Sequence, residues 1–402
     1  MRLRTLPIFL CFFLMGFVDA MGPLASTIQK QYSLSGFIAG LLPAFAFVAF
    51  AIFSVPGGVL AARIGKKNLL ILALTLNALG VLVPTAVVPG FALLLASVFV
   101  LGVGTTLLQV AGNPIMRDVS AEGRYARNLS FAQFVKGIGS VGSTALVAVL
   151  AVGEMGWRRV FPVFLVLTLV GLTALVFLRV KETRAEEPPS VGSSLALLKQ
   201  TVFALAVFGI FLYVGAEVGL GTWLAPRLEG LLAVGSGAGL AAWLVRGLEG
   251  LGFTGDPAKL LGPTLFFLCL MIGRLVGSGI LSFLSPRTFF RISAGLGILG
   301  IAALLPGVPV LALAGVVACG LGFANIWPLL FSTTVEARPE RSAELSGLMC
   351  MAIVGGAVLP PFMGRLQDRF GVGPAFLVPL AAFAYLFVLS MTGAGKAQAK
   401  EA

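Results

Sequence analysis

The chain has 402 residues, of which 58% are hydrophobic and only 11% charged, and its formal net charge is +12. Soluble proteins carry about 25% charged residues, so the composition excludes an ordinary soluble domain. The chain has no histidine, which excludes a histidine proton relay and the usual metal sites, and we expect neither a metal nor a cofactor. We interpret the four cysteines as small buried apolar residues without disulfides: Cys11, Cys269, Cys319 and Cys350.

Apolar runs of about 20 residues recur along nearly the whole chain, and each is long enough to cross the roughly 30 Å hydrocarbon core of a bilayer. The first is too long for a signal-peptide core and is expected to be a helix. The runs predict an all-α membrane protein with twelve transmembrane helices, near residues 6–29, 37–62, 69–88, 91–115, 129–152, 157–180, 198–225, 260–284, 288–306, 309–333, 345–364 and 373–393.

The basic residues gather in alternate loops, as the positive-inside rule requires of cytoplasmic loops. We therefore expect no nucleic-acid partner, and we place both termini in the cytoplasm and the chain in the plasma (bacterial inner) membrane. The residues that carry this bias are Arg2, Arg4, Arg63, Lys66, Lys67, Arg117, Arg124, Arg127, Lys181, Arg184, Arg287, Arg338 and Arg341.

A charged, proline-broken segment divides six spans from six, and it predicts an N-terminal bundle over 1–180, a cytoplasmic linker over 181–197 and a C-terminal bundle over 198–402. Weak matches between the halves favour an internal duplication with a working site at the midplane. They pair Leu101–Gly104 with Cys319–Gly322, Leu129 and Ser130 with Leu345 and Ser346, and Gly139 with Gly355. The outer loop 227–258 is expected to hold a short surface helix near 240–245, and its role is left open.

Two acidic residues lie inside predicted spans, at matching places in the two halves. Asp19 and Glu217 each stand six residues after the Phe of a Phe-Leu pair. A carboxylate in hydrocarbon costs about 2.5 to 3.5 kcal/mol even on lenient scales, so these acids predict a solute transporter with coupling or ion-binding groups in its membrane interior.

Lys136 is a further charge inside a span, and Asp19 is predicted to pair with it, so that proton binding and substrate binding are coupled. There are two alternatives: a permanent salt bridge that fixes the two spans, and a direct contact of Lys136 with an anionic substrate. Glu217 has two interpretations of equal weight: a structural bridge to Arg274, or a role in cation or substrate binding.

Amide side chains are the candidate ligands for a sugar, since each offers donors and acceptors to neighbouring hydroxyls. Trp327 offers a ring on which a sugar could stack, although such residues more often pack. Asn113 precedes a proline and could equally satisfy the kink. The predicted substrate-binding residues are Gln109, Asn113, Gln133, Asn325 and Trp327.

The loop from Gly58 to Lys67 reads GVLAARIGKK. It resembles the signature loop of the major facilitator superfamily, Gly-x-Leu-x-Asp-Arg-x-Gly-Arg-Lys, with Ala62 in place of the usual Asp. The resemblance implies that fold, two six-helix bundles that alternate access to a central site. It also implies that one charged partner of the neighbouring helix ends is lost at Ala62. Gating or structural roles are expected for Gly58, Arg63, Gly65, Lys66 and Arg274.

Within that superfamily the chain resembles the fucose and glucose/galactose:proton symporters, on segments in both halves: 107–114 (LLQVAGNP), 127–133 (RNLSFAQ), 213–218 (YVGAEV), 271–274 (MIGR) and 351–357 (MAIVGGA). It departs from the fucose symporters at three functional positions. Their span-one carboxylate falls at Gly22, their span-four acid at Gln109 and their span-five amide at Lys136. Neither fucose specificity nor the proton carrier of that family can therefore be transferred.

The sequence predicts a monomeric secondary transporter, not an enzyme, that moves a monosaccharide or related polar solute through the lipid bilayer, coupled to H⁺ through Asp19. The alternative is a carrier of an acidic sugar or other organic anion bound by Lys136, either Na⁺-coupled or uncoupled. A drug antiporter and a non-transporting sensor are weaker alternatives. Neither the solute nor the direction of transport follows from the sequence.

Overall fold

The structure is a computed structural model, and it describes residues 6–34, 36–151, 156–183, 189–234 and 257–391. These residues form helices joined by short turns, and they group into two compact units. Unit 1 comprises residues 1–204 together with 334–351, and unit 2 comprises residues 205–333 together with 352–402. The predicted boundaries at 180 and 198 stay a prediction, and residues 334–351 pack with the N-terminal unit.

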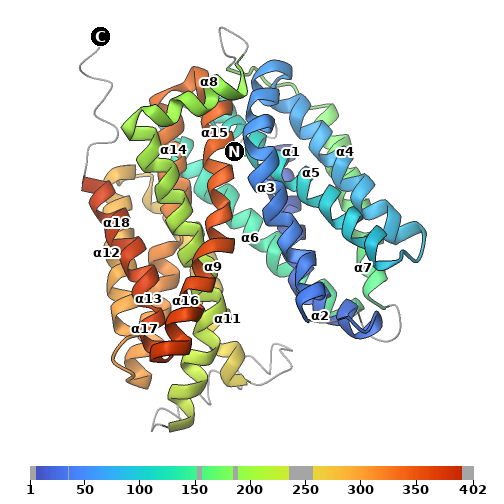
Figure 1. The fold of residues 1–402 in the computed structure, drawn as a ribbon. Helices are drawn as coiled ribbons and strands as arrows, with labels where there is room; N and C mark the ends of the chain where they lie inside the picture. The colour runs from blue at the N-terminus through green and yellow to red at the C-terminus, as the bar shows by residue number, and fades with distance from the viewer. Residues whose placement is uncertain (1–5, 35, 152–155, 184–188, 235–256, 392–402) are drawn as a thin grey trace. The chain divides into compact units, whose positions relative to one another are not determined.

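Unit 1 contains the helices of the first half together with η5 and α15 from the second half. Within it, α4, α5 and α7 lie side by side (Figure 1), and α15 packs on α3 and α5. Its elements are α1 (Leu6–Met15), η2 (Gly16–Ala20), α2 (Met21–Gln31), α3 (Gly36–Ile64), α4 (Lys66–Ala86), α5 (Phe91–Val119), α6 (Tyr125–Leu150), η3 (Gly156–Arg159), α7 (Val160–Val176), α8 (Val191–Ala196), η4 (Leu197–Lys199), η5 (Pro339–Arg341) and α15 (Ser342–Met351).

Unit 2 contains the remaining helices, and in it α12 packs against both α13 and α18 (Figure 1). Helix α9 begins in unit 1 and α14 ends in it, and both have most of their length in unit 2. The elements are α9 (Thr201–Val234), α11 (Pro257–Ile280), α12 (Pro286–Ala303), α13 (Pro309–Phe323), α14 (Ile326–Ala337), η6 (Ala352–Val354), α16 (Gly355–Phe370), α17 (Val372–Ala375) and α18 (Leu377–Met391).

Nine helical segments among the described residues are long and apolar enough to cross a membrane. The apolar stretch Leu6–Ala20, which includes η2, is shorter than these segments, and α6 and α12 carry charged residues such as Lys136 and Arg291. The all-helical membrane fold is confirmed, and the count of twelve stays a prediction. The short helix expected near 240–245 lies outside the described residues.

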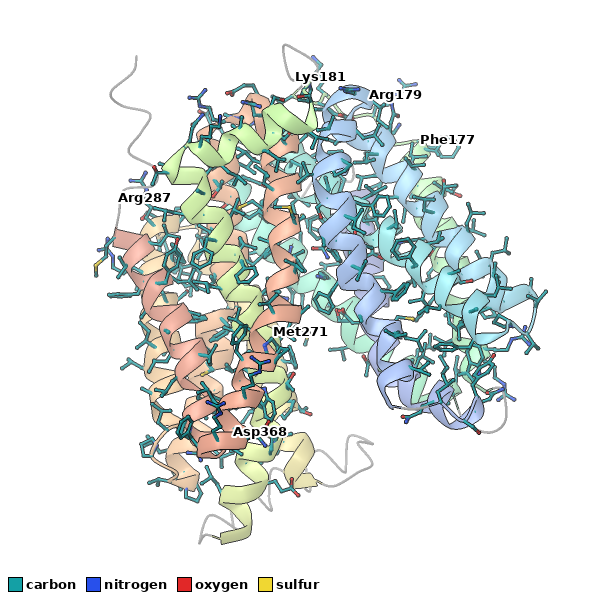
Figure 2. All side chains as sticks on the ribbon, viewed as in Figure 1. Phe177, Arg179, Lys181, Met271, Arg287 and Asp368 are labelled. Carbon is teal, nitrogen blue, oxygen red and sulfur yellow. The ribbon has the colours of Figure 1, made fainter. Side chains whose placement is uncertain are left out.

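Charged residues mark the ends of these helices. Figure 2 shows Arg179 and Lys181 just after α7, close to Phe177, whose side chain is 79% exposed. Arg287 stands at the start of α12, and Asp368 lies near the end of α16. Apolar stretches between polar ends are what a bilayer requires of its spanning helices.

Turns between the helices are tied by side chains. The Tyr32 hydroxyl, in the turn after α2, donates to the carbonyl of Pro89 at 2.6 Å. Burial raises the pKa of Tyr32, which nearby Arg158 opposes, so the hydroxyl stays a donor at neutral pH. Arg158 itself donates to the carbonyls of Pro84 and Thr85, capping the C-terminal end of α4.

Candidate functional site

The first predicted span is broken where it carries its acid. Residues 16–20 form the 3₁₀ turn η2 between α1 and α2, and Asp19 lies in that turn with an exposed side chain. A 3₁₀ stretch inside a longer helix often marks a functional hinge. Ser140 of α6 donates to Asp19 Oδ2 at 2.5 Å. The carboxylate is therefore held by a neutral hydroxyl at a break in the helix.

The predicted ion pair between Asp19 and Lys136 is absent from this structure. Within the described ranges, no carboxylate oxygen lies within 4.0 Å of Lys136 Nζ. Lys136 stands one helical turn before Ser140 on α6, about 6 Å along the axis, and Ser140 takes the carboxylate. A functional link between the two charges stays a prediction.

Three of the predicted amide ligands come together in unit 1. Gln109, Asn113 and Gln133 are all buried. Gln133 Nε2 donates to Asn113 Oδ1 at 3.3 Å, and Asn113 Nδ2 donates to the Gln109 carbonyl at 2.9 Å. The Tyr125 hydroxyl donates to the Asn113 carbonyl at 2.9 Å. These bonds fix amides from α5 and α6 in one polar cluster.

The carbonyl freed by Pro114 is that of Val110, because proline has no N–H to donate to the residue four before it. Asn113 does not fill this gap, since its amide bonds the Gln109 carbonyl. Ser346 of α15 fills it instead, with its hydroxyl 2.6 Å from the Val110 oxygen. The kink in α5 is thus satisfied from a helix of the second half of the chain.

In unit 2, Glu217 of α9 meets Arg274 of α11 at 3.4 Å, as one interpretation of the sequence predicted. Arg274 Nε also donates to the Ala324 carbonyl at 3.2 Å, and Asn325 Nδ2 donates to the Gly273 carbonyl at 2.8 Å. Residues 324 and 325 lie where α13 ends and α14 begins. The ion pair and the amide therefore tie α11 to the break between two helices.

Polar atoms in the same region of unit 2 are buried without a hydrogen-bond partner. They are Asn325 Oδ1 and Trp327 Nε1. Each such atom costs about 1–3 kcal/mol, so each is expected to gain a partner when a polar molecule enters. Trp327 also packs on Phe331, with ring centroids 5.6 Å apart. The predicted roles of Glu217, Asn325 and Trp327 in binding an ion or a solute stay predictions.

Each unit contains an equivalent close contact between a glycine and a backbone carbonyl. In unit 1, a Cβ at Gly139 would collide with the carbonyl oxygen of Phe13. In unit 2, a Cβ at Gly355 would collide with the carbonyl oxygen of Phe211. Phe13 and Phe211 are the residues six before the two acids, and Gly139 and Gly355 were matched on sequence. The contact supports the predicted correspondence between the halves.

The loop between α3 and α4 is built around a glycine with positive φ. Gly65 has φ +94° and stands immediately before α4. The backbone N–H groups of Lys66 and Lys67 donate to the Glu182 carboxylate, at 2.6 and 3.0 Å. Glu182 therefore places a negative charge at the positive end of the α4 dipole.

The other predicted gating residues have identified partners. Lys66 Nζ lies 2.6 Å from Asp118 Oδ2, and both side chains are buried. Arg63 donates to the Pro189 carbonyl through Nε and Nη2. A Cβ at Gly58 would lie 2.6 Å from the Ala343 carbonyl oxygen of α15. These contacts hold the linker side of unit 1 together.

Sequence reasoning missed four residues of this arrangement: Ser140, Ser346, Glu182 and Asp118. A proline inside a span signals a carbonyl in need of a donor, but it does not say which helix supplies the donor. An acid in a charged linker and an acid at the end of a span are partial signals for Glu182 and Asp118. Ser140 had no signal, because serines occur throughout these helices.

All four cysteines are free thiols, and three are buried. Among the residues that the structure describes, no group of three or more His, Cys, Asp or Glu could hold a metal ion.

Membrane-length helices, broken spans and polar groups in their interior define a multi-pass membrane transporter, not an enzyme. The chain belongs to the Major Facilitator Superfamily, whose family description matches residues 8–353. It is 27% identical to the "Glucose/galactose transporter" of Brucella abortus biovar 1 (strain 9-941), over 96% of this chain and 92% of that protein. It is 24% identical to the "L-fucose-proton symporter" of Escherichia coli (strain K12), over 90% of this chain and 86% of that protein.

A solved transporter has the same fold. The crystal structure of the Major Facilitator Superfamily transporter FucP in the outward conformation matches with a TM-score of 0.78, at 21% identity, over 97% of this chain and 99% of that one. The resemblance to the fucose and glucose/galactose symporters, drawn first from short segments, thus extends over nearly the whole chain.

Proposed function

We propose that the chain is a secondary transporter that moves a monosaccharide or related polar solute by alternating access, with a proton carried on Asp19. The observation that carries the proposal is an exposed carboxylate in the 3₁₀ turn that separates α1 from α2, inside an apolar segment. Such a group can load from solvent, and it sits where a small change in backbone geometry changes its surroundings. The sugar and fucose transporters among its relatives support this solute class.

The solute ligands that we propose are the amides of unit 1, Gln109, Asn113 and Gln133, with Asn325 and Trp327 of unit 2. Gln133 donates to Asn113, and Asn113 donates to the backbone carbonyl of Gln109. A sugar hydroxyl can replace such bonds. The unpartnered atoms Asn325 Oδ1 and Trp327 Nε1 would gain partners from the solute. We further propose a monomer in the plasma membrane with both termini cytoplasmic.

A second candidate is transport of an acidic sugar or another organic anion. It is favoured by Lys136, a cation on a membrane helix with no carboxylate within 4.0 Å in the described part of the chain. An uncompensated cation in this setting costs several kcal/mol, and a solute carboxylate would offset that cost. Coupling to Na⁺, or none, remains compatible with this candidate.

The test uses vesicles that carry the purified full-length protein in a weak buffer with an external pH electrode. We expect the outside to become alkaline when one of a panel of neutral sugars and sugar acids is added, and not in protein-free vesicles or with a protonophore. Asp19→Asn should abolish the alkalinisation while solute exchange continues. The matched variant Glu217→Gln, at the corresponding acid of unit 2, should keep it.

Each contrary result has a distinct meaning. Loss of proton movement in Glu217→Gln but not in Asp19→Asn would place coupling in the other half. Labelled solute entry with a flat pH for every compound would reject proton coupling. A response to sugar acids alone that disappears in Lys136→Ala would select the second candidate.

A further inference from the structure

Ser140 has one hydroxyl proton and two acceptors within its reach. Its Oγ lies 2.5 Å from Asp19 Oδ2 and 3.2 Å from the backbone oxygen of Lys136. A hydroxyl donates one hydrogen bond at a time and can also accept. The direction of this bond therefore depends on the protonation state of Asp19.

The two states of Asp19 need opposite arrangements of the same atoms. An ionised carboxylate can only accept, so the Ser140 hydroxyl must point to Asp19. A protonated carboxyl donates its O–H to Ser140 Oγ, and the serine proton then turns to the Lys136 carbonyl. The covalent change is the addition of one proton to Asp19, and the two hydrogen bonds of Ser140 rearrange around it.

We propose that Ser140 is a positioning residue for the coupling proton, which sets the proton concentration at which Asp19 loads and transmits its state to the Lys136 turn of α6. This rests on the proposed function of Asp19. The bond to the ionised acid is the stronger of the two, because charge-assisted hydrogen bonds are about twice as strong as neutral ones. Ser140 therefore favours the unloaded, ionised acid.

The backbone around this pair is held in place. A Cβ at Gly16 would collide with the Ser140 backbone N, so η2 and α6 are in direct contact. One turn further along α6, the Ser143 hydroxyl lies 3.1 Å from the Gly16 carbonyl. Ser143 thus binds the same 3₁₀ turn as Ser140 does, but through the backbone and not through the acid.

The elements that pack on η2 carry few charged or titratable groups. Of the elements packed on η2, α6 contributes Lys136, α1 contributes the thiol of Cys11, and α2 carries Lys30 in its last turn. The charges of α3 and α5 stand at their ends, as Arg63 and as Arg117 with Asp118. Among the side chains that the structure describes, Ser140 is the one that hydrogen-bonds Asp19.

The experiment measures initial uptake against external pH for full-length protein in vesicles. In Ser140→Ala the carboxylate loses its donor, and we expect half-maximal uptake at about a three-fold lower proton concentration. Ser143→Ala, the matched control, should keep the wild-type midpoint. Ser140→Thr, which restores a hydroxyl, should bring the midpoint back.

The result that overturns the inference is an equal midpoint in Ser140→Ala and Ser143→Ala, or a shift that Ser140→Thr does not reverse. Solute exchange in Asp19→Asn should be unchanged by adding Ser140→Ala, because Ser140 acts through the acid. If Asp19→Asn retains proton movement, the proposed function fails. If Asp19→Asn loses it while Ser140→Ala keeps the wild-type midpoint, only the role of Ser140 fails.

Discussion

At the scale of single residues, the Lys66–Asp118 pair has the clearest energetic consequence. The two charges are 2.6 Å apart, with side chains 3% and 1% exposed, and Lys66 also donates to the Thr183 carbonyl. Breaking a buried pair leaves an uncompensated charge, whereas removing both partners leaves none. The pair links α4, α5 and the start of the linker. Removing one of its charges is costly because the other is left buried without a partner.

We expect Lys66→Met to destabilise the protein by about 3–5 kcal/mol, seen as a lower midpoint of thermal unfolding in detergent. Lys66→Met with Asp118→Leu should recover most of that loss. Lys181→Met, at an exposed lysine of the linker, serves as the control and should leave the midpoint unchanged. A double variant no more stable than the single one would contradict this account.

The residue scale also shows what the sequence can and cannot predict about the site. Asp19 and Glu217 were recognisable because a carboxylate inside an apolar run is costly wherever it points. The partner of Asp19 was not predictable. The position of a residue along each helix gives the depth of its side chain in the membrane, but not the direction in which the side chain points around the helix axis. Lys136 and Ser140 differ by one turn of α6, and only coordinates separate them. Arg274 was recognised because it is a charged residue far from either end of the predicted span 260–284.

At the scale of helices, some spans were predicted to within a few residues, whereas α9 (Thr201–Val234) runs well past the end predicted at 225. The prediction of 91–115 compares with α5 at Phe91–Val119, and 37–62 with α3 at Gly36–Ile64. The 3₁₀ turns η2 and η6 were not predicted, because hydropathy does not distinguish an α-helix from a slightly tighter one. Both turns stand beside the close contacts made by Gly139 and Gly355.

Those close contacts give a prediction for pairs of helices. Gly139→Ala and Gly355→Ala should each strongly destabilise the protein, because a Cβ would meet a carbonyl oxygen that cannot move without its helix. Gly142→Ala is the control on α6, where nothing lies within 4 Å of the added Cβ. Thermal unfolding should leave that variant at or above wild type. Equal stability of Gly139→Ala and Gly142→Ala would show that the contact is not required.

A second prediction concerns the kink in α5. Ser346→Ala leaves the Val110 carbonyl without a donor and should cost about 1–3 kcal/mol. Pro114→Ala restores a backbone N–H that can bond this carbonyl. In the Pro114→Ala background, Ser346→Ala should therefore cost much less, as a double-mutant cycle of unfolding free energies would show. Additive costs would mean that Ser346 serves another partner.

At the scale of the whole molecule, the composition and the spacing of apolar runs were enough to predict a helical membrane carrier, and the family match confirms it. The grouping of α15 with unit 1 was not predictable. It depends on the tight packing of Gly58 against Gly347 and on the Ser346 hydrogen bond, and these are pairwise contacts between distant segments.

The distribution of basic residues predicts the orientation of the chain in the membrane. Because basic residues gather in alternate loops, we expect both termini in the cytoplasm. A fluorescent protein fused to the C-terminus should fluoresce, and alkaline phosphatase fused there should be inactive. Phosphatase inserted between α4 and α5, near Val88, should be active. The opposite pattern would reverse the topology and reject the proposed placement of the linker.

The matching backbone contacts of the two units bear on how such a protein could have arisen. Gly139 against Phe13 and Gly355 against Phe211 are alike, whereas the acids nearby have different companions, a serine for Asp19 and an arginine for Glu217. After a gene duplication, a glycine pressed on a carbonyl has almost no tolerated replacement, but the neighbouring polar side chains can drift. Ancestry would then persist in the tightest contacts of the backbone, while each copy acquired its own chemistry.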